Sequence, residues 1–538
     1  MVQGLVEGKN AVNTPNTEGT RKLAKASVFM MVMTLLSRVL GLAKNMAIAY
    51  LFGTTATVDA FWLALTVPMI FAFIFTTGAD NYIPIFSKYL AEKGKEKAWE
   101  AGNVILTLYL GLIILGVVVG ALSTPILVKI LAPGFQVSVQ HLTVRLIWVM
   151  MGMSLFLGLS SLGRIVLYNE EKFYAPVLGG VFNNVVILLV MTLFYKKWGI
   201  FAAAVGISIG ASCQVLVQLP QLWSLRRHLA LRFNLKHRAV RDWARLTFPL
   251  YLGRAGSELN SAVDKIFASF LPIGAISALS YGFLIIELPT TVFSHSLLNA
   301  LFPRLSREAS RQDSDGDREI MKKSLRIITL FLLPIMVAII LFRKAIVKII
   351  FEHGAFSEKS AEMTAVAILF YGLGILAFGL NDALVFGFNA HHNNVDSMKI
   401  GWVRVLANIV LNAVLVTTMG LAGLALATTL SGYLKLGILW VVYQKKYGCV
   451  VDSDWRPWLQ KVAISTFLLA ATLIGYRLIF GPLLGVSSFW GELGYLTGGL
   501  TAGLLVFLVG AFVLGIEEVI SIKAFATTQL RIKFGFQE

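Results

Sequence analysis

The sequence has little charge and almost no cysteine. Only 14% of its 538 residues are charged, against roughly 25% in an ordinary soluble domain. The two cysteines, Cys213 and Cys449, lie far apart and form no metal-binding or redox pattern, which excludes a disulfide-stapled secreted module. The chain also has no glycine-rich phosphate loop with a lysine, no HExxH and no GxSxG. These absences exclude a soluble enzyme and a disordered scaffold.

Apolar side chains are in excess instead. They make up 57% of the chain, and the mean hydropathy is +0.75. At about 20 residues per membrane-spanning helix, this composition supplies on the order of a dozen or more spans. The sequence therefore predicts an all-α polytopic membrane protein with about 14 transmembrane helices. The apolar stretches lie at 26–52, 60–87, 102–131, 142–167, 174–195, 199–223, 244–271, 275–303, 325–351, 361–388, 396–418, 421–443, 457–480 and 489–515.

Basic residues are unevenly distributed over the gaps between these stretches. The alternate gaps near 53–58, 132–140, 271–275 and 481–488 carry no Lys or Arg. Since loops rich in Lys and Arg stay cytoplasmic, both termini are predicted to be cytoplasmic. The formal net charge of +18 then reflects topology and contact with anionic membrane lipids, and nucleic acid is not expected as a partner. The basic gaps hold Arg226, Arg227, Arg232, Lys236, Arg238, Arg241 and Arg245, and Arg304, Arg307, Arg311, Arg318, Lys322 and Lys323.

The chain contains an internal repeat at a spacing of about 220 residues. Pro68 opens a pattern that ends in Ala132-Pro133-Gly134-Phe135, and Pro289 opens a matching pattern that ends in Gly354-Ala355-Phe356. Six helices in each repeat predict two lobes related by a pseudo-two-fold axis along the membrane normal, plus two C-terminal helices. Transporters use this arrangement with substrate between the halves. A duplicated channel or a purely structural bundle is the alternative.

The repeat divides the chain into six predicted regions. They are a cytoplasmic N-terminal tail at 1–25, an N-lobe of six helices at 26–225, a basic cytoplasmic linker at 226–243, a C-lobe of six helices at 244–446, two further helices at 447–515 and a cytoplasmic C-terminal tail at 516–538.

Ionisable side chains within a membrane normally face protein or a water-filled cavity, because a charge at mid-bilayer costs about 2.5–3.5 kcal/mol on insertion scales. The first helix holds Arg38 and Lys44 beside Asn45, and Asp59 begins the second. We interpret this set as a cationic cavity for an anionic substrate such as a phosphate, where Lys acts as a point charge. The alternative is that Lys44 and Asp59 only snorkel or pair near the interface.

A second polar set falls on the seventh, eleventh and twelfth helices. Asp264 lies on the seventh, Asn408 and Asn412 share one face of the eleventh, and Thr428 lies on the twelfth. A carboxylate with amide and hydroxyl oxygens suits a small cation such as sodium. Interhelical hydrogen bonding explains the Asn and Thr residues equally well.

Further intramembrane charges have less obvious roles. Arg254 and Glu258 are four residues apart and could neutralise each other. Glu287, Asp382 and Arg404 have no clear partner in the sequence. The last helix carries glycines at close-packing spacing, which predicts tight helix packing there. These are Gly494, Gly498, Gly499 and Gly503.

The ordered set of motifs resembles the MurJ (MviN) lipid II flippases of the multidrug/oligosaccharidyl-lipid/polysaccharide exporter superfamily, over about residues 26–515. The matching stretches are Ser37-Arg38-Val39-Leu40-Gly41, Phe52-Gly53, Asp59-Ala60-Phe61, Pro68, Gly78-Ala79, Pro84, Ala132-Pro133-Gly134-Phe135, Asn169 to Asn183, Phe267-Ala268-Ser269, Gly354-Ala355-Phe356 and Gly423-Leu424-Ala425-Leu426-Ala427-Thr428.

This resemblance implies a transporter, not an enzyme, of the bacterial cytoplasmic (inner) membrane. It would move an undecaprenyl-pyrophosphate-linked glycan, such as the peptidoglycan precursor lipid II, to the outer leaflet by alternating access. Arg38 and Lys44 match the headgroup-binding cations, and a sodium site maps to Asp264, Asn408, Asn412 and Thr428. The last two helices would hold the lipid tail. We expect a monomer with no cofactor besides Na⁺ as a coupling ion, and with the cell-wall synthesis machinery as partner.

The sequence also departs from the family pattern. Phe71-Ala72-Phe73 replaces a basic pair, Thr77 replaces an acid, and Leu284 stands where the family has an arginine. A divergent paralogue that exports an exopolysaccharide or O-antigen repeat unit on a lipid carrier is therefore an alternative. A MATE-like multidrug/cation antiporter is another, although the basic first helix argues against it. A membrane glycosyltransferase would need a sizeable outer loop with acids, which the sequence lacks.

Overall fold

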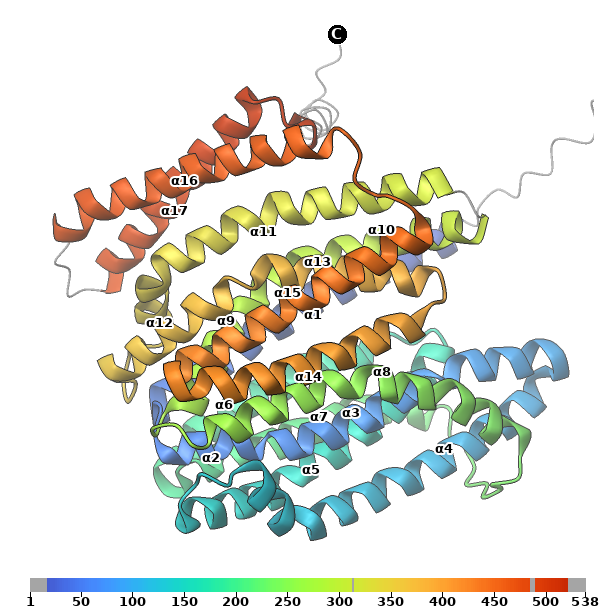
Figure 1. Cartoon of the computed structure of the whole chain (residues 1–538). Coiled ribbons are helices and arrows are strands. Elements are labelled where there is room, and N and C mark those ends of the chain that lie inside the picture. The colour runs from blue at the N-terminus through green and yellow to red at the C-terminus, as the bar shows by residue number, and fades with distance from the viewer. Residues whose placement is uncertain (1–16, 312–313, 484–488, 521–538) are drawn as a thin grey trace, which may run out of the picture. The chain divides into compact units, whose positions relative to one another are not determined.

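The computed structural model describes residues 17–520 except 312–313 and 484–488, and these described residues form helices without strands. Residues 1–16 of the predicted N-terminal tail and 521–538 of the predicted C-terminal tail lie outside the described residues. The elements are α1 (Thr17–Phe52), α2 (Ala56–Ala64), α3 (Thr66–Asp80), α4 (Tyr82–Leu131), α5 (Val137–Asn169), α6 (Tyr174–Trp198), α7 (Phe201–Trp223), α8 (Arg238–Ala268), α9 (Ala275–Pro289), the π-helix η1 (Thr290–His295), α10 (Ser296–Arg311), α11 (Ser314–Ile350), α12 (Glu358–Gly372), α13 (Ile375–Ala390), α14 (Asn394–Met419), α15 (Leu421–Tyr447), α16 (Trp455–Leu483) and α17 (Phe489–Val513) (Figure 1).

Length and composition allow eleven described helical stretches to cross a membrane, or up to twelve if the bent pair α12–α13 forms one span. The protein is therefore an all-helical, multi-pass membrane protein, as predicted, while the number of 14 spans stays a prediction. One source of the difference is α8, which is absent from the eleven because charged residues such as Arg241, Arg245 and Glu258 are spread along it.

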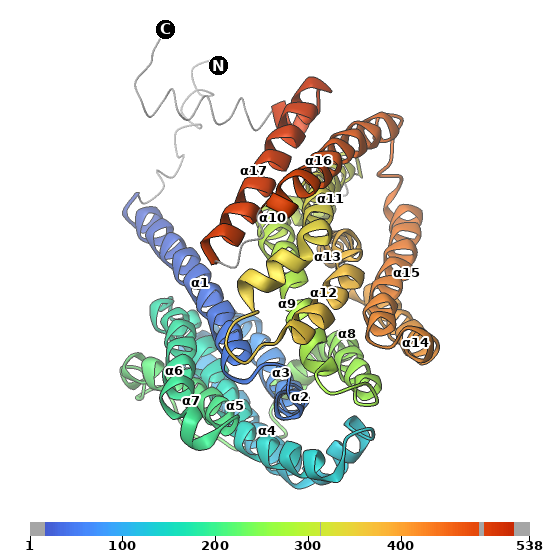
Figure 2. The same ribbon diagram turned by 90° about the vertical axis from the view of Figure 1, so that its left-hand side faces the viewer.

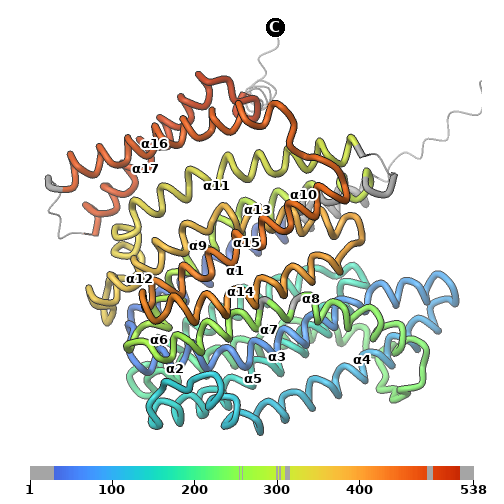
Figure 3. The backbone as a smooth tube through the Cα atoms, in the orientation of Figure 1, coloured from blue at the N-terminus to red at the C-terminus, as the bar shows by residue number. Residues whose placement is uncertain are grey.

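A second source is the stretch Ala56–Leu131, which is counted as one helical stretch of 76 residues although a charged segment divides its apolar parts. At 1.5 Å per residue such a run would be about 110 Å long, far more than a bilayer core of about 30 Å requires. The backbone at Gly94 is not helical, with φ 80° and ψ 174°, so two helices meet there at a kink. The tube turns back within α4 (Figure 3). Glycine reaches this left-handed region without a Cβ penalty. The reversal separates two of the predicted apolar stretches.

The contacts group the chain into two units. Unit 1 comprises residues 1–47, 67–123 and 146–247, and unit 2 comprises 48–66, 124–145 and 248–538. The predicted lobes were continuous in sequence, so the structure differs in assigning the short segments 48–66 and 124–145 to unit 2. Within their own units, α6 lies beside α7 and α14 lies beside α15 (Figure 2).

Unit 1 is held by a buried core and by side chains that reach helix carbonyls. Its core includes Phe75, Tyr82 and Tyr109. The Trp243 indole donates a hydrogen bond to the Gly78 carbonyl at 2.8 Å, and the Ser154 hydroxyl donates to the Pro68 carbonyl at 2.7 Å. In a membrane such side-chain bonds satisfy backbone groups that helix irregularities leave unpaired.

The two C-terminal helices pack through the predicted glycine face. A Cβ added to Gly499 would approach Phe342 of α11 to 2.6 Å, and one added to Gly503 would approach Leu473 of α16 to 2.6 Å. Glycine is therefore needed for α17 to lie this close to its neighbours (Figure 1). The opposite side of α17 exposes Leu505, Val509 and other large apolar side chains, as a lipid-facing helix does.

Glycines of the repeat motifs join the segment 48–66 to the rest of unit 2. The amide of Ala355 donates a hydrogen bond to the Tyr50 carbonyl at 2.8 Å. Gly53 (φ +64°) and Gly354 (φ +63°) lie on either side of this contact, and a Cβ on them would come within 2.3 Å and 2.4 Å of opposing carbonyl oxygens. No larger residue fits at either position unless the opposing backbone moves.

Buried charges at helix ends complete this attachment. The Asp59 carboxylate of α2, only 3% exposed, accepts hydrogen bonds from the amides of Gly274 (2.6 Å) and Ser277 (2.8 Å) and from the Ser277 hydroxyl (2.5 Å). It therefore caps the N-terminus of α9, where a negative charge is favoured. A second charged group attaches the same segment to α8. The Lys265 ammonium donates hydrogen bonds to the Trp62 carbonyl (2.9 Å) and to the Thr66 hydroxyl (2.7 Å).

We expect the change Asp59→Asn to destabilise the fold by about 2 kcal/mol or more, because hydrogen bonds to a charged group are worth about 1.5–3 kcal/mol each. An amide in place of the carboxylate also turns a donor toward the α9 amides. The measurement is thermal unfolding in detergent. Asp80→Asn serves as the control, since Asp80 pairs with Arg164 at an exposed site and should change stability by less than about 1 kcal/mol. Equal melting temperatures for the two variants would refute the capping role.

Candidate functional site

The predicted cationic set on the first membrane helix lies on α1 in unit 1. Arg38 is exposed, and Lys44 and Asn45 are half-buried. Among the residues that the structure describes, none of these three side chains makes a hydrogen bond or an ion pair. A charge on a membrane helix is costly unless it meets water or a partner, so the environment of these two cations needs an explanation.

The backbone next to Arg38 is fixed by the neighbouring helix α6. The Asn184 amide donates hydrogen bonds to the carbonyl (3.0 Å) and hydroxyl (3.1 Å) of Ser37, and that hydroxyl donates to the Gly180 carbonyl at 3.1 Å. Asn184 lies on α6. Its role in the structure is to hold α1 against α6, which positions the turn of the helix that carries Arg38.

Asp59, the fourth member of the predicted substrate set, has a different environment. It belongs to unit 2, and its carboxylate is fully engaged by α9 as described above. The structure therefore gives Asp59 a capping role that its position in the sequence does not reveal. One feature of the sequence could have indicated this capping role. Gly274 followed three residues later by Ser277 is typical of a helix start, where free backbone N–H groups require a hydrogen-bond acceptor.

The four residues predicted to bind a cation come together in unit 2. The Asp264 carboxylate of α8 accepts hydrogen bonds from the Asn412 amide at 2.7 Å and from the Thr428 hydroxyl at 3.2 Å. The Asn408 carbonyl oxygen accepts from the Asn412 amide at 2.9 Å. Asn408 and Asn412 are fully buried, and Thr428 is 3% exposed. Two helices, α14 and α15, thus direct hydrogen-bond donors at a carboxylate of a third helix, α8.

Two oxygens in this cluster have no hydrogen-bond partner among the described residues. They are the Oδ1 atoms of Asn412 and of Asn260, which lies one turn before Asp264 and donates to it at 3.3 Å. A buried, unsatisfied acceptor costs free energy, so these two oxygens are open to a further donor or a cation. The donor set of carboxylate, amide and hydroxyl oxygens fits a hard cation such as Na⁺. Asn260 is the member that the sequence analysis missed.

Two of the remaining intramembrane charges, Arg404 and Asp382, lie near partners on other helices. Arg404 lies close enough to interact electrostatically with both Asp264 and Asp382, and its guanidinium lies 5.9 Å from the Phe378 ring centroid. Asp382 pairs with His295 of η1 at 3.2 Å, a partner that the sequence did not indicate.

Glu258 is half-buried near Lys265, and Glu287 is exposed at the end of α9. The side chain of Arg254 lies outside the described residues, so its predicted pairing with Glu258 stays a prediction.

Positions where the family carries charge are packed as apolar contacts. The Phe71 ring lies against Gly116 and Gly120 of α4, where an added Cβ would come within 3.5 Å and 2.7 Å of it. Thr77 is 1% exposed, and its hydroxyl has no hydrogen-bond partner among the described residues. These side chains contribute to the core of unit 1 and supply no charge to a cavity.

Comparison with solved structures supports the fold. The chain is similar to the lipid II flippase MurJ in an inward closed conformation, with a TM-score of 0.76, 21% identity and coverage of 91% of this chain and 100% of that one. It is also similar to an inward-facing multidrug resistance MATE family transporter of the MOP superfamily, with a TM-score of 0.64, 12% identity and coverage of 79% and 98%.

Comparison with curated sequences and families identifies the chain more narrowly. Probable lipid II flippases MurJ from Buchnera aphidicola (subsp. Schizaphis graminum) and Vibrio cholerae are each 27% identical to it, over 502 and 436 residues. The alignments cover 92% and 78% of this chain and 97% and 83% of those proteins. The family model described as lipid II flippase MurJ matches residues 48–493. Because this match covers most of the chain, the protein belongs to the MurJ family of lipid II flippases, which are transporters and not enzymes.

Proposed function

We propose that this protein moves lipid II, or a closely related undecaprenyl-pyrophosphate-linked glycan, from the inner to the outer leaflet by alternating access. The observation that carries the proposal is the family match over residues 48–493, which includes most of both units. The internal repeat adds support, since two similar halves around a central substrate are a common design for such transport.

The proposed contact for the pyrophosphate is the pair of cations on α1. Neither Arg38 nor Lys44 has an anionic partner among the described residues, and a pyrophosphate would supply one. Arg can bind a phosphate through two parallel hydrogen bonds, whereas Lys acts as a point charge. With Phe71 and Leu284 at positions where the family has cations, these two residues carry a larger share of headgroup recognition than in the family pattern.

The Asp264 cluster is the proposed ion site. Asp264, Asn412 and Thr428 would hold Na⁺, and Asn408 would orient Asn412 through the 2.9 Å hydrogen bond. The bound ion would supply a positive charge that neutralises the Asp264 carboxylate. The protein's own part is to keep the cluster assembled from α8, α14 and α15, so that the ion couples the positions of three helices.

The proposed cellular setting rests on two observations. The match to the MurJ family supports a location in the bacterial inner membrane. The basic gaps alternate with gaps that lack Lys and Arg, which supports cytoplasmic termini. We further propose a monomer that delivers its product to the cell-wall synthesis machinery, and a lipid-tail site on α16 and α17.

A drug/cation antiporter is the competing function, because MATE transporters share the fold. The cations on α1 favour the flippase. An antiporter for cationic drugs needs acids in its cavity, whereas an unpaired Lys44 repels a cationic substrate and attracts an anionic one.

Depletion of the protein in a bacterial host should reduce the carrier-linked precursor that is accessible to a membrane-impermeant label on the outer face. Total precursor should rise or stay constant, since synthesis on the inner face continues. Purified protein in liposomes with defined lipid II then tests the substrate directly. Unchanged labelling after depletion would remove the flippase proposal.

Replacing Lys44 by Ala should lower transport at least about tenfold, because a charge-assisted hydrogen bond of about 1.5–3 kcal/mol is lost. Insertion and thermal stability should be unaffected, as Lys44 has no partner within the described chain. Lys44→Arg should restore transport, which separates a charge requirement from a packing requirement. Full activity of Lys44→Ala would refute the headgroup role.

Sodium should raise the melting temperature of the purified protein relative to potassium at equal ionic strength. A ligand present at 100 times its Kd stabilises by about 2.7 kcal/mol. Asp264→Ala should abolish the sodium effect, while the control Glu258→Gln on the same helix should retain it. Sodium-independent melting of the parent protein, or a sodium effect that survives Asp264→Ala, would contradict the ion site.

A further inference from the structure

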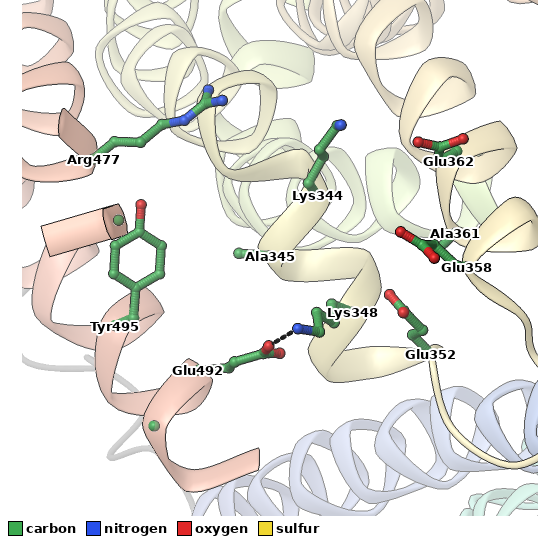
Figure 4. A pocket seen from close by; sticks show the side chains of 12 residues that line it. Lys344, Ala345, Lys348, Glu352, Glu358, Ala361, Glu362, Arg477, Glu492 and Tyr495 are labelled. Carbon is green, nitrogen blue, oxygen red and sulfur yellow. Dashed lines mark ion pairs between the residues drawn. The ribbon is translucent and has the colours of Figure 1, made fainter. Parts of the chain in front are cut away.

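A charged cavity of about 490 Å³ lies within unit 2, at the ends of four helices (Figure 4). The C-terminal ends of α11 and α16 and the N-terminal ends of α12 and α17 line it. It is separate from the α1 cations and from the Asp264 cluster, because none of those residues lines it. Neither proposed transport contact therefore accounts for it.

The cavity carries both signs of charge on different walls. Lys344 of α11 and Arg477 of α16 line one part, while Glu358 and Glu362 of α12 face them from the other side (Figure 4). None of these four side chains makes an ion pair with a described residue. Opposite charges that share a cavity without pairing leave room for a ligand that bridges them.

The centre of the cavity is fixed by an ion pair between Lys348 of α11 and Glu492 of α17 (Figure 4). Beside it lies Glu352, whose carboxyl has its pKa raised by burial, with Lys348 opposing and Glu358 adding to the rise. Together with Glu358 and Glu362 it makes one part of the lining acidic.

The position of the cavity along the helices points to the headgroup layer of the membrane. α11 carries Lys322 and Lys323 near its start and the cavity at its end, and 37 residues make it about 55 Å long. The cavity thus lies at the end opposite to the basic gaps, on the outer side by the positive-inside rule. The neighbouring Trp490 is 77% exposed and Phe489 is 45% exposed, as aromatic residues are at a membrane interface.

We propose that this cavity binds the zwitterionic amine–phosphate headgroup of an outer-leaflet phospholipid. Arg477 and Lys344 would bind the phosphate, and Glu358 and Glu362 would bind the primary ammonium. With three cations against four carboxylates, the walls carry about one net negative charge, which disfavours a purely anionic headgroup. The unpaired Arg477 and Lys344 in turn disfavour a ligand that is only cationic.

The test is native mass spectrometry of the full-length protein with phosphatidylethanolamine or phosphatidylglycerol of the same acyl chains. Phosphatidylethanolamine should be retained at least about fivefold better. Glu358→Gln with Glu362→Gln should remove that preference, and Arg477→Gln should weaken binding of both lipids. Arg456→Gln, at the other end of α16, is the matched control and should behave as the parent. Each variant is compared only after gel filtration shows a single monodisperse species.

Three outcomes would overturn the proposal. They are equal retention of the two lipids by the parent protein, an unchanged preference in the double glutamate variant, and competition by soluble phosphoethanolamine as strong as by the lipid. The last would assign the cavity to a free small molecule. If the double variant does not fold, Arg477→Gln provides the test. Lipid retention by this variant equal to that of the parent protein would refute the site.

Discussion

The attachment of α2 to α9 through Asp59 is the constraint on which the architecture of unit 2 depends. One carboxylate accepts three hydrogen bonds from the start of α9, two of them from backbone amides that a helix N-terminus cannot satisfy internally. The glycine contact between Gly53 and Gly354 allows the same segment to approach the chain before α12. A short stretch of the N-terminal half is thereby made part of unit 2.

The intramembrane charges fall into two kinds, those that have hydrogen-bond partners within the protein and those that have none among the described residues. Asp59, Lys265 and Asp264 are satisfied by helix ends or by converging side chains, so their charges serve the structure or a tightly enclosed ion. Lys44 and Arg38 have no such partners among the described residues. An unpaired charge in a membrane is costly, and this contrast is the reason why α1 is proposed as the contact for an anionic headgroup.

Features carried by local composition could be predicted from the sequence. The apolar stretches, the packing role of Gly499 and Gly503, and the convergence of Asp264 with Asn412 follow from spacing and from family resemblance. The number of spans could not be predicted from hydropathy. The charges along α8 lower its mean hydropathy, and residues 56–131 count as one helical stretch although they contain two apolar ones. Other features arise from tertiary packing between distant segments, and hydrophobic periodicity does not predict them. Examples are the pairing of Asp382 with His295 and the four-helix cavity around Arg477.

The burial of Asp59 also has a consequence for hydration. All three of its donors come from a single helix end, so any movement that separates α2 from α9 removes them together. The carboxylate must then be solvated, and water has to enter a region where only 3% of this residue is now accessible. Opening at this point consequently takes up solvent, and its equilibrium depends on the activity of water.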